Sequence, residues 1–276
     1  MEATYALSKT VIEYANEKGI SIKEKMDLEE QTILTTLPIQ WEIDSTKKEE
    51  LKFLGFRYEY QTSEVTGGQR LKYLDKKKTY TIDYYPSHKP KVEVTVPDYY
   101  VVPKSWNKVL HRLNVNFIET TELEQKDYTV EAYRIKSYET SRSVYEGHFR
   151  HSKIEVDAFK KEIAIDERYV LVPTDQRGTK LIVHLLEPQA EGSLFSWNFF
   201  DPILQQKEWY SDYVFEDTAK KLLEEDSEMK GKFEALKKED PEFANNPRAQ
   251  LYFIYINSSY YEPTHNLYPV YRLLPP

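Results

Sequence analysis

The sequence predicts an α+β protein with N-terminal helices, a β-rich, sandwich-like and mostly antiparallel middle, and a helical C-terminal part. Three observations predict this class. Apolar residues follow helical spacing in residues 1–37, strand-like patterns dominate the middle of the chain, and helical spacing returns after residue 194. Because strands and helices do not alternate regularly, a parallel doubly wound sheet is not expected.

Composition narrows the possible functions. The 276 residues are 40% hydrophobic, which is enough for one large or two small domains. A net charge of -8 provides no basic surface for nucleic acid or for an anionic membrane, so we expect neither as a partner. The chain has no cysteine, which excludes disulfides, thiolate catalysis and cysteine-ligated zinc.

The N-terminal residues predict two helices. Leu7, Val11 and Tyr14 share one face of the first helix, and Gly19 is expected to end it. Residues 21–24 form a capping box that should open a second helix, which Pro38 ends. The apolar residues expected on one face of this second helix are Ile22, Met26, Ile33 and Leu37. The start of the chain lacks the basic and continuous apolar segments of a signal peptide.

Strand patterns follow. Residues 56–62 and 69–74 flank Gly67 and Gly68, which predicts a hairpin. Further strands are expected at residues 79–85, 91–96, 128–135, 153–159, 168–173 and 180–188. Between them, Ser105 is expected to cap a short helix that carries Trp106, Val109, Leu110 and Leu113.

The C-terminal part predicts helices separated by proline. One helical stripe consists of Phe215, Ala219, Leu222 and Leu223, and another contains Phe233 and Leu236. Pro241 and Pro247 interrupt the chain. We therefore divide the sequence into a helical segment at residues 1–37, a small β-rich domain at 38–103 and an α+β domain at 104–276.

Two histidine motifs in the sequence are candidate metal sites. His148 and His151, followed by Glu155, have a spacing that converges only in a helix or a turn. Gly147 and the polar flanks instead predict an exposed loop with no shared third ligand.

The second motif is His184-x-x-Glu187, with His265 as a conceivable third ligand. Leu181, Val183 and Leu185 alternate as on a buried strand, so the motif is expected to be structural. The sequence also lacks a Gly-x-Ser-x-Gly elbow, a Walker loop and a dinucleotide-binding Gly-x-Gly-x-x-Gly.

An aromatic cluster lies at residues 194–203. Its members are Phe195, Trp197, Phe199 and Phe200. Such a cluster can line a sugar or peptide groove, but large buried aromatic side chains more often fill a core. We expect a mostly buried cluster that ties the strands to the helical end.

Several segments together resemble a known family. The segments are "YVVPKSWNKVLHRL" (100–113), "YVLVPTDQRGTKLIVHLLEPQAEGSLFSWNFFD" (169–201) and "HNLYPVYRL" (265–273), with "LPIQWEID", "SEVTGGQRLKY" and "DPEFANNPRAQLYFIY" fitting the same pattern. They resemble the region that follows the catalytic domain in large bacterial zinc carboxypeptidase-like (carboxypeptidase A-type) metallopeptidases. The resemblance covers nearly the whole chain, and it implies that the first helix completes an upstream peptidase domain.

The resemblance implies a non-catalytic accessory region that packs on or supports that peptidase domain in cis. It implies no catalytic residue, no metal ligand and no cofactor in this chain, with zinc held by the peptidase domain of the parent protein, and an extracytoplasmic location. Self-association of the isolated chain is also expected. Two alternatives stay open: a standalone zinc hydrolase that uses His148, His151, His184 or His265, and a peptide- or carbohydrate-binding β module.

Overall fold

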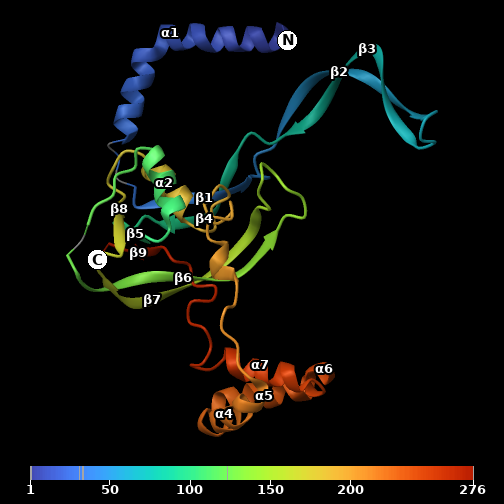
Figure 1. Ribbon diagram of the computed structural model, residues 1–276. Coiled ribbons are helices and arrows are strands. Elements are labelled where there is room, and N and C mark those ends of the chain that lie inside the picture. The colour runs from blue at the N-terminus through green and yellow to red at the C-terminus, as the bar shows by residue number, and fades with distance from the viewer. Residues whose placement is uncertain (1, 31, 33, 123, 276) are drawn as a thin grey trace. The chain divides into compact units, whose positions relative to one another are not determined.

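The computed structural model describes residues 2–30, 32, 34–122 and 124–275. It confirms the predicted α+β class, with an N-terminal helix, antiparallel sheets in the middle and helices at the C-terminal end (Figure 1). The chain divides into two compact units, Leu34–Val96 and the combination of Met1–Ile33 with Pro97–Pro276. The predicted domain limits after residues 37 and 103 stay a prediction, because a compact unit is not by itself a domain that folds alone.

The N-terminal segment is one helix, α1 (Glu2–Glu30), which bends but does not break (Figure 1). The predicted stop at Gly19 and the predicted new start at Ser21 are therefore wrong. A glycine inside a helix costs only about 1 kcal/mol relative to alanine, and the good helix formers Glu17 and Lys18 precede it while Lys23 and Glu24 follow within a turn and a half. Leu37 lies on a strand rather than on this helix, and Ile33 lies outside the described residues.

The unit Leu34–Val96 consists of two antiparallel strand pairs. Strand β1 (Thr36–Ile43) pairs with β4 (His88–Thr95), and β2 (Glu49–Thr62) pairs with β3 (Gln69–Tyr84). Pro38 does not end a helix but lies in β1, beside a register irregularity, where a strand tolerates proline. The predicted hairpin is confirmed, and Gly67 supplies the positive φ of 69° that its turn needs.

The other unit contains a five-stranded antiparallel sheet in the order β7-β6-β9-β5-β8. Its strands are β5 (Tyr99–Pro103), β6 (Lys126–Thr140), β7 (His151–Ile165), β8 (Tyr169–Pro173) and β9 (Tyr271–Leu273). Val101, Val130, Ala132, Leu171 and Tyr271 belong to one buried cluster on this sheet. The last strand of the described chain therefore lies between strands that come much earlier in the sequence.

Two short helices accompany this sheet. Helix α2 (Asn107–Val115) was predicted, but its N-cap is Trp106, and no side chain caps it, so the role expected of Ser105 is wrong. Helix α3 (Thr179–Leu186) replaces the strand predicted at residues 180–188. Its buried residues, Ile182, Val183 and Leu186, have the spacing of one helix face.

The C-terminal part forms a small helical cluster after the 3-10 turn η1 (Asp201–Leu204). Its helices are α4 (Asp212–Glu225), α5 (Ser227–Glu239), α6 (Pro241–Ala244) and α7 (Pro247–Ile256). The predicted stripes are confirmed, since Phe215, Ala219 and Phe233 are buried together. Pro241 and Pro247 occupy the first positions of α6 and α7, where proline has no hydrogen bond to lose. No described helix is both long and apolar enough to cross a membrane.

Candidate functional site

The His184-x-x-Glu187 motif spans the end of helix α3, with His184 inside the helix. Glu187 follows the helix and is buried, where it accepts a hydrogen bond of 2.7 Å from the Tyr100 hydroxyl. The Nε of Arg272, on β9, lies 3.0 Å from the same carboxylate oxygen. Arg272 also contacts Glu131 and the Tyr133 hydroxyl, both on β6. The carboxylate thus joins α3 to three strands of the sheet.

The surroundings of Glu187 suit a structural group. Burial raises the pKa of the Glu187 carboxyl, while Arg272, Tyr100 and Tyr133 oppose that shift. Burial likewise raises the pKa of Tyr100 and of Tyr133 far above the ordinary tyrosine range. The tyrosines therefore stay protonated and can donate to the carboxylate.

His184, Glu187 and His265, the three residues considered as a zinc site, do not converge on a common point. His184 is half-buried on α3, and burial lowers the pKa of its imidazole. His265 lies in the C-terminal segment, where its Nε2 is 3.2 Å from the Leu204 carbonyl oxygen and its Nδ1 contacts the Tyr261 hydroxyl. Within the described ranges, no group of three or more histidine and carboxylate side chains is placed to hold a metal ion.

The other histidine pair is also separated. His148 lies in a turn against the rings of Trp197 and Phe199. His151 begins β7 and is buried, with its Nδ1 3.0 Å from Thr140 Oγ1 and its Nε2 3.0 Å from Asp201 Oδ1. His151 therefore lies beside the predicted exposed loop, but it is not solvated as the polar flanks suggested. The reason is that the 194–203 segment covers it.

Glu155 lies apart from both histidines. It is exposed and forms an ion pair of 3.8 Å with Lys136. The three residues of the first motif thus have three different sets of partners, and none is shared among them.

The aromatic cluster is mostly buried, as the sequence predicts. Phe195 and Phe200 are fully buried and both contact the ring of Tyr268. Trp197 and Phe199 are half-buried, and the Arg150 guanidinium lies 4.4 Å from the centre of the Trp197 ring. The cluster therefore acts as core with one partly open edge.

A groove that the sequence analysis did not identify lies in the helical C-terminal part. Two adjoining cavities of about 460 Å³ and about 450 Å³ share Trp209 and Tyr210 as lining residues. We call them together the Trp209 groove. The first cavity is completed by Asp212, Asn246, Arg248, Ala249 and Tyr252, and the second by a set that includes Glu208, Phe215, Tyr255, Tyr260 and Tyr261.

The rings of the Trp209 groove are held in place by contacts with one another. Trp209 is 61% exposed and stacks on Tyr252, with ring centres 6.2 Å apart and planes 25° apart. Tyr210 packs on Phe215 and Tyr255, with ring centres 4.8 Å apart in each case. The groove therefore presents fixed aromatic faces rather than loose side chains.

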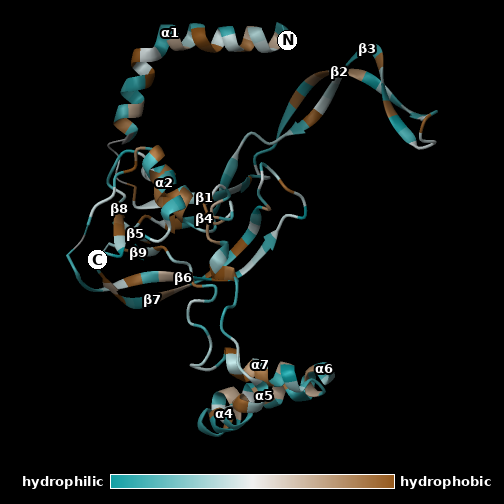
Figure 2. Ribbon diagram, in the orientation of Figure 1, coloured by the Kyte–Doolittle hydropathy of each residue, from teal (hydrophilic) through white to brown (hydrophobic). Residues whose placement is uncertain are grey.

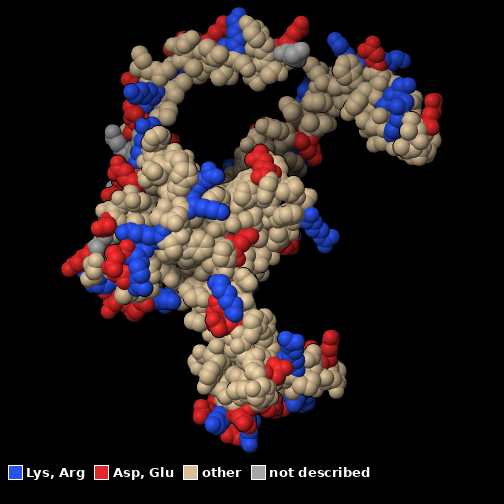
Figure 3. All heavy atoms as spheres, viewed as in Figure 1, with Lys and Arg blue, Asp and Glu red and all other residues tan. Residues whose placement is uncertain are grey.

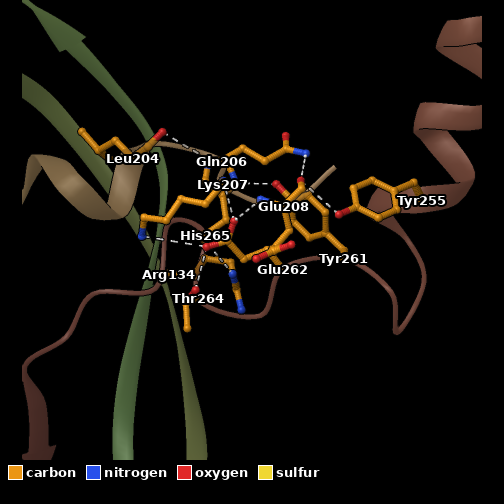
Figure 4. Close-up of polar contacts among 10 residues, drawn as sticks. All are labelled: Arg134, Leu204, Gln206, Lys207, Glu208, Tyr255, Tyr261, Glu262, Thr264 and His265. Carbon is orange, nitrogen blue, oxygen red and sulfur yellow. Dashed lines mark hydrogen bonds and ion pairs between the residues drawn. The ribbon is translucent and has the colours of Figure 1, made fainter. Parts of the chain in front are cut away.

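A carboxylate beneath the groove fixes the segment that carries Trp209. Glu262 is buried and accepts hydrogen bonds from the backbone N–H groups of Lys207 (2.7 Å) and Glu208 (3.2 Å) (Figure 4). The Thr264 hydroxyl donates to its other oxygen at 2.8 Å. The backbone hydrogen bond from Lys207 and the bond from Thr264 lower the pKa of Glu262.

The strand β6 is tied to the same region. Arg134 donates to the carbonyl oxygens of His265 and Pro263, at 2.5 Å and 3.3 Å (Figure 4). These contacts link the sheet to the chain segment that leads out of the helical part. The groove therefore rests on an ordered polar base.

A further candidate surface is the apolar face of α1. Leu7 is 67% exposed, and Val11 and Tyr14 are each 58% exposed. Figure 2 shows hydrophobic residues along the whole helix, and Figure 3 shows charges of both signs between them. The predicted helical face of Leu7, Val11 and Tyr14 is therefore real and uncovered.

Comparison of the chain with protein-family models, with curated proteins and with solved structures finds no match. The arguments below therefore rest on the residues of this chain and their contacts. The fold and its surfaces describe an α+β protein with an uncovered N-terminal helix, a buried ionic network and an aromatic groove.

Proposed function

We propose that the chain is a non-catalytic accessory region that packs on a zinc carboxypeptidase-like peptidase domain. The observation that carries the proposal is the uncovered apolar face of α1, formed by Leu7, Val11 and Tyr14. Exposed apolar surface of this kind typically marks a protein–protein contact. The peptidase partner comes from the sequence resemblance described above.

The ionic network supports a structural role for the one carboxypeptidase-like motif. A catalytic carboxylate must reach a metal or a water molecule. Glu187 is instead buried and held by Tyr100 and Arg272. The same network favours the accessory function over the standalone zinc hydrolase, since Glu187 already has its partners.

The test uses the purified catalytic domain of a bacterial zinc carboxypeptidase-like enzyme, from which its own C-terminal region has been removed. We expect this domain to bind the chain in isothermal titration calorimetry. The replacement of Leu7 and Val11 by aspartate should weaken binding at least about tenfold, as for the loss of central apolar anchors. The matched control is Ile20→Asp, because Ile20 is 81% exposed but lies on another face of α1.

A second measurement separates the accessory function from the zinc hydrolase. The chain is supplied with zinc and assayed on blocked dipeptides. The accessory function predicts no turnover above the zinc-only control. Turnover that a chelator abolishes, and that is lost in His184→Ala, would overturn the proposal. His184→Ala serves here because His184 is only half-buried, so that its replacement disturbs the fold less than a change at Glu187.

A further inference from the structure

We propose that the Trp209 groove binds an extended, proline-rich peptide segment in the polyproline II conformation. This binding function is separate from the docking of α1. It rests on the shape of the groove, on the way in which its tyrosine hydroxyls are used, and on the charge of its second cavity.

The groove offers two neighbouring cavities to a polyproline II helix, whose side chains recur at regular intervals. This helix has three residues per turn and rises about 3.1 Å per residue, so that every third residue returns to the same side. A proline-rich ligand therefore presents compact apolar pyrrolidine rings to a surface at regular intervals. The two cavities, which share Trp209 and Tyr210, provide two neighbouring places for such rings, each lined by tyrosine.

Three tyrosines that line the groove offer ring faces, because their hydroxyls are already bonded inside the protein. The Tyr252 hydroxyl donates to Gln206 Oε1 at 3.0 Å, and the Tyr255 hydroxyl donates to the Glu208 carbonyl at 3.2 Å. The Tyr261 hydroxyl contacts His265. A sugar brings many hydroxyls that each need a partner, and leaving them unpaired is costly. A pyrrolidine ring has no such requirement, so the second cavity, where the hydroxyls of Tyr255 and Tyr261 already have internal partners, suits proline.

Both the proposed ligand and the groove are already ordered before binding, which supports the same ligand. The polyproline II helix loses little conformational freedom on binding, which is why aromatic-lined grooves recognise it. On the protein side, Glu262 fixes the backbone of Lys207 and Glu208, directly before Trp209 (Figure 4). The ordering cost of binding is therefore small for both partners.

The charge of the second cavity indicates what flanks the prolines. The residues that line this cavity include Glu208 and Glu262 and contain no lysine or arginine. Glu262 is buried beneath the backbone, whereas Glu208 is exposed. A basic residue beside the prolines would meet the Glu208 carboxylate, so we expect the preferred ligand to carry an arginine or lysine at that end.

The test is a fluorescence-anisotropy titration of the full chain with a labelled decaproline peptide that carries one terminal arginine. We expect saturable binding, and Trp209→Ala should weaken it at least about tenfold. Tyr213→Ala is the matched control, because Tyr213 is 85% exposed on the neighbouring helix and is not among the residues that line either cavity. Circular dichroism shows whether both variants keep the wild-type fold.

Further arms identify the ligand. Glu208→Gln should weaken binding of the arginine peptide but leave binding of plain decaproline unchanged. A glycine-serine peptide of the same length and charge should not bind. Equal binding of that peptide, unchanged binding by Trp209→Ala, absence of decaproline binding, or saturable binding of cello- or chito-oligosaccharides alone would each overturn the proposal.

Discussion

The Nε atom of Arg272 lies 3.0 Å from the carboxylate of Glu187, and both side chains are buried. The pair connects the last strand of the sheet with the end of helix α3. A buried ion pair of this kind contributes little by its mere presence, but removing one partner leaves an uncompensated charge.

The first prediction concerns this pair. Arg272→Met should lower the free energy of unfolding by about 3–5 kcal/mol, because Glu187 would stay buried without its counter-charge. Urea denaturation measures the change. Lys153→Met is the control, since it breaks the exposed pair with Glu139 and should cost about 0–1 kcal/mol. Equal effects of the two variants would contradict a structural role for Arg272.

The second prediction separates two members of the aromatic cluster. Phe195→Ala should lower the free energy of unfolding by about 3–5 kcal/mol, because its ring is fully buried. Trp197 is half-buried, and for Trp197→Ala we expect about 1–3 kcal/mol. Both values come from chemical denaturation. If Trp197→Ala lowered the free energy of unfolding more than Phe195→Ala, the partly open edge would contribute more to stability than the buried part of the cluster.

The third prediction concerns pH. The pKa of Glu262 is lower in the folded protein than in the unfolded chain, where the pKa of a glutamate is about 4.3. Its contribution to stability is therefore present above that value and is lost as the pH falls through the folded pKa. We expect wild type to lose more stability than Glu262→Gln between about pH 7 and about pH 3. Urea denaturation at several pH values measures this, with the exposed Glu234→Gln as control.

The fourth prediction concerns α1. In the absence of a partner, its uncovered apolar face should cause the isolated chain to self-associate at high concentration. Replacing Leu7 and Val11 by lysine should shift the chain toward monomer in sedimentation velocity, whereas Ile20→Lys should shift it less. A chain that stays monomeric at every concentration would show that this face does not bind a second copy.

Much of the fold follows from local patterns. The hairpin around Gly67, the strands β6, β7 and β8, and the stripes of α4 and α5 all have short-range signals in the sequence. Helix α3 was missed because Leu181, Val183 and Leu185 alternate like a strand, while the spacing of Ile182, Val183 and Leu186 fits one helix face equally well. Whether this segment becomes a strand or a helix depends on which of its side chains are buried against the rest of the protein. Those contacts come from residues far away in the sequence.

The candidate sites were harder to predict for the same reason. The network of Glu187 joins residues from α3, β5, β6 and β9, which are far apart in the sequence. The Trp209 groove needs Tyr252 from α7 beside Trp209, which precedes α4. The two tyrosine-rich stretches at residues 208–213 and 252–261 were a local signal, but nothing in the sequence alone places them side by side.

The position of β9 has a consequence for how the chain folds during synthesis. Tyr271–Leu273 leaves the ribosome after the other strands of its sheet, yet it fills the place between β5 and β6. Until it emerges, those two strands keep unpaired edges that can pair with other chains. A nascent chain also folds its earlier parts first, and long-range pairing is slow. A polypeptide that stops before Tyr271 should therefore be prone to aggregate, and a chaperone that covers open strand edges would protect the chain until β9 has emerged.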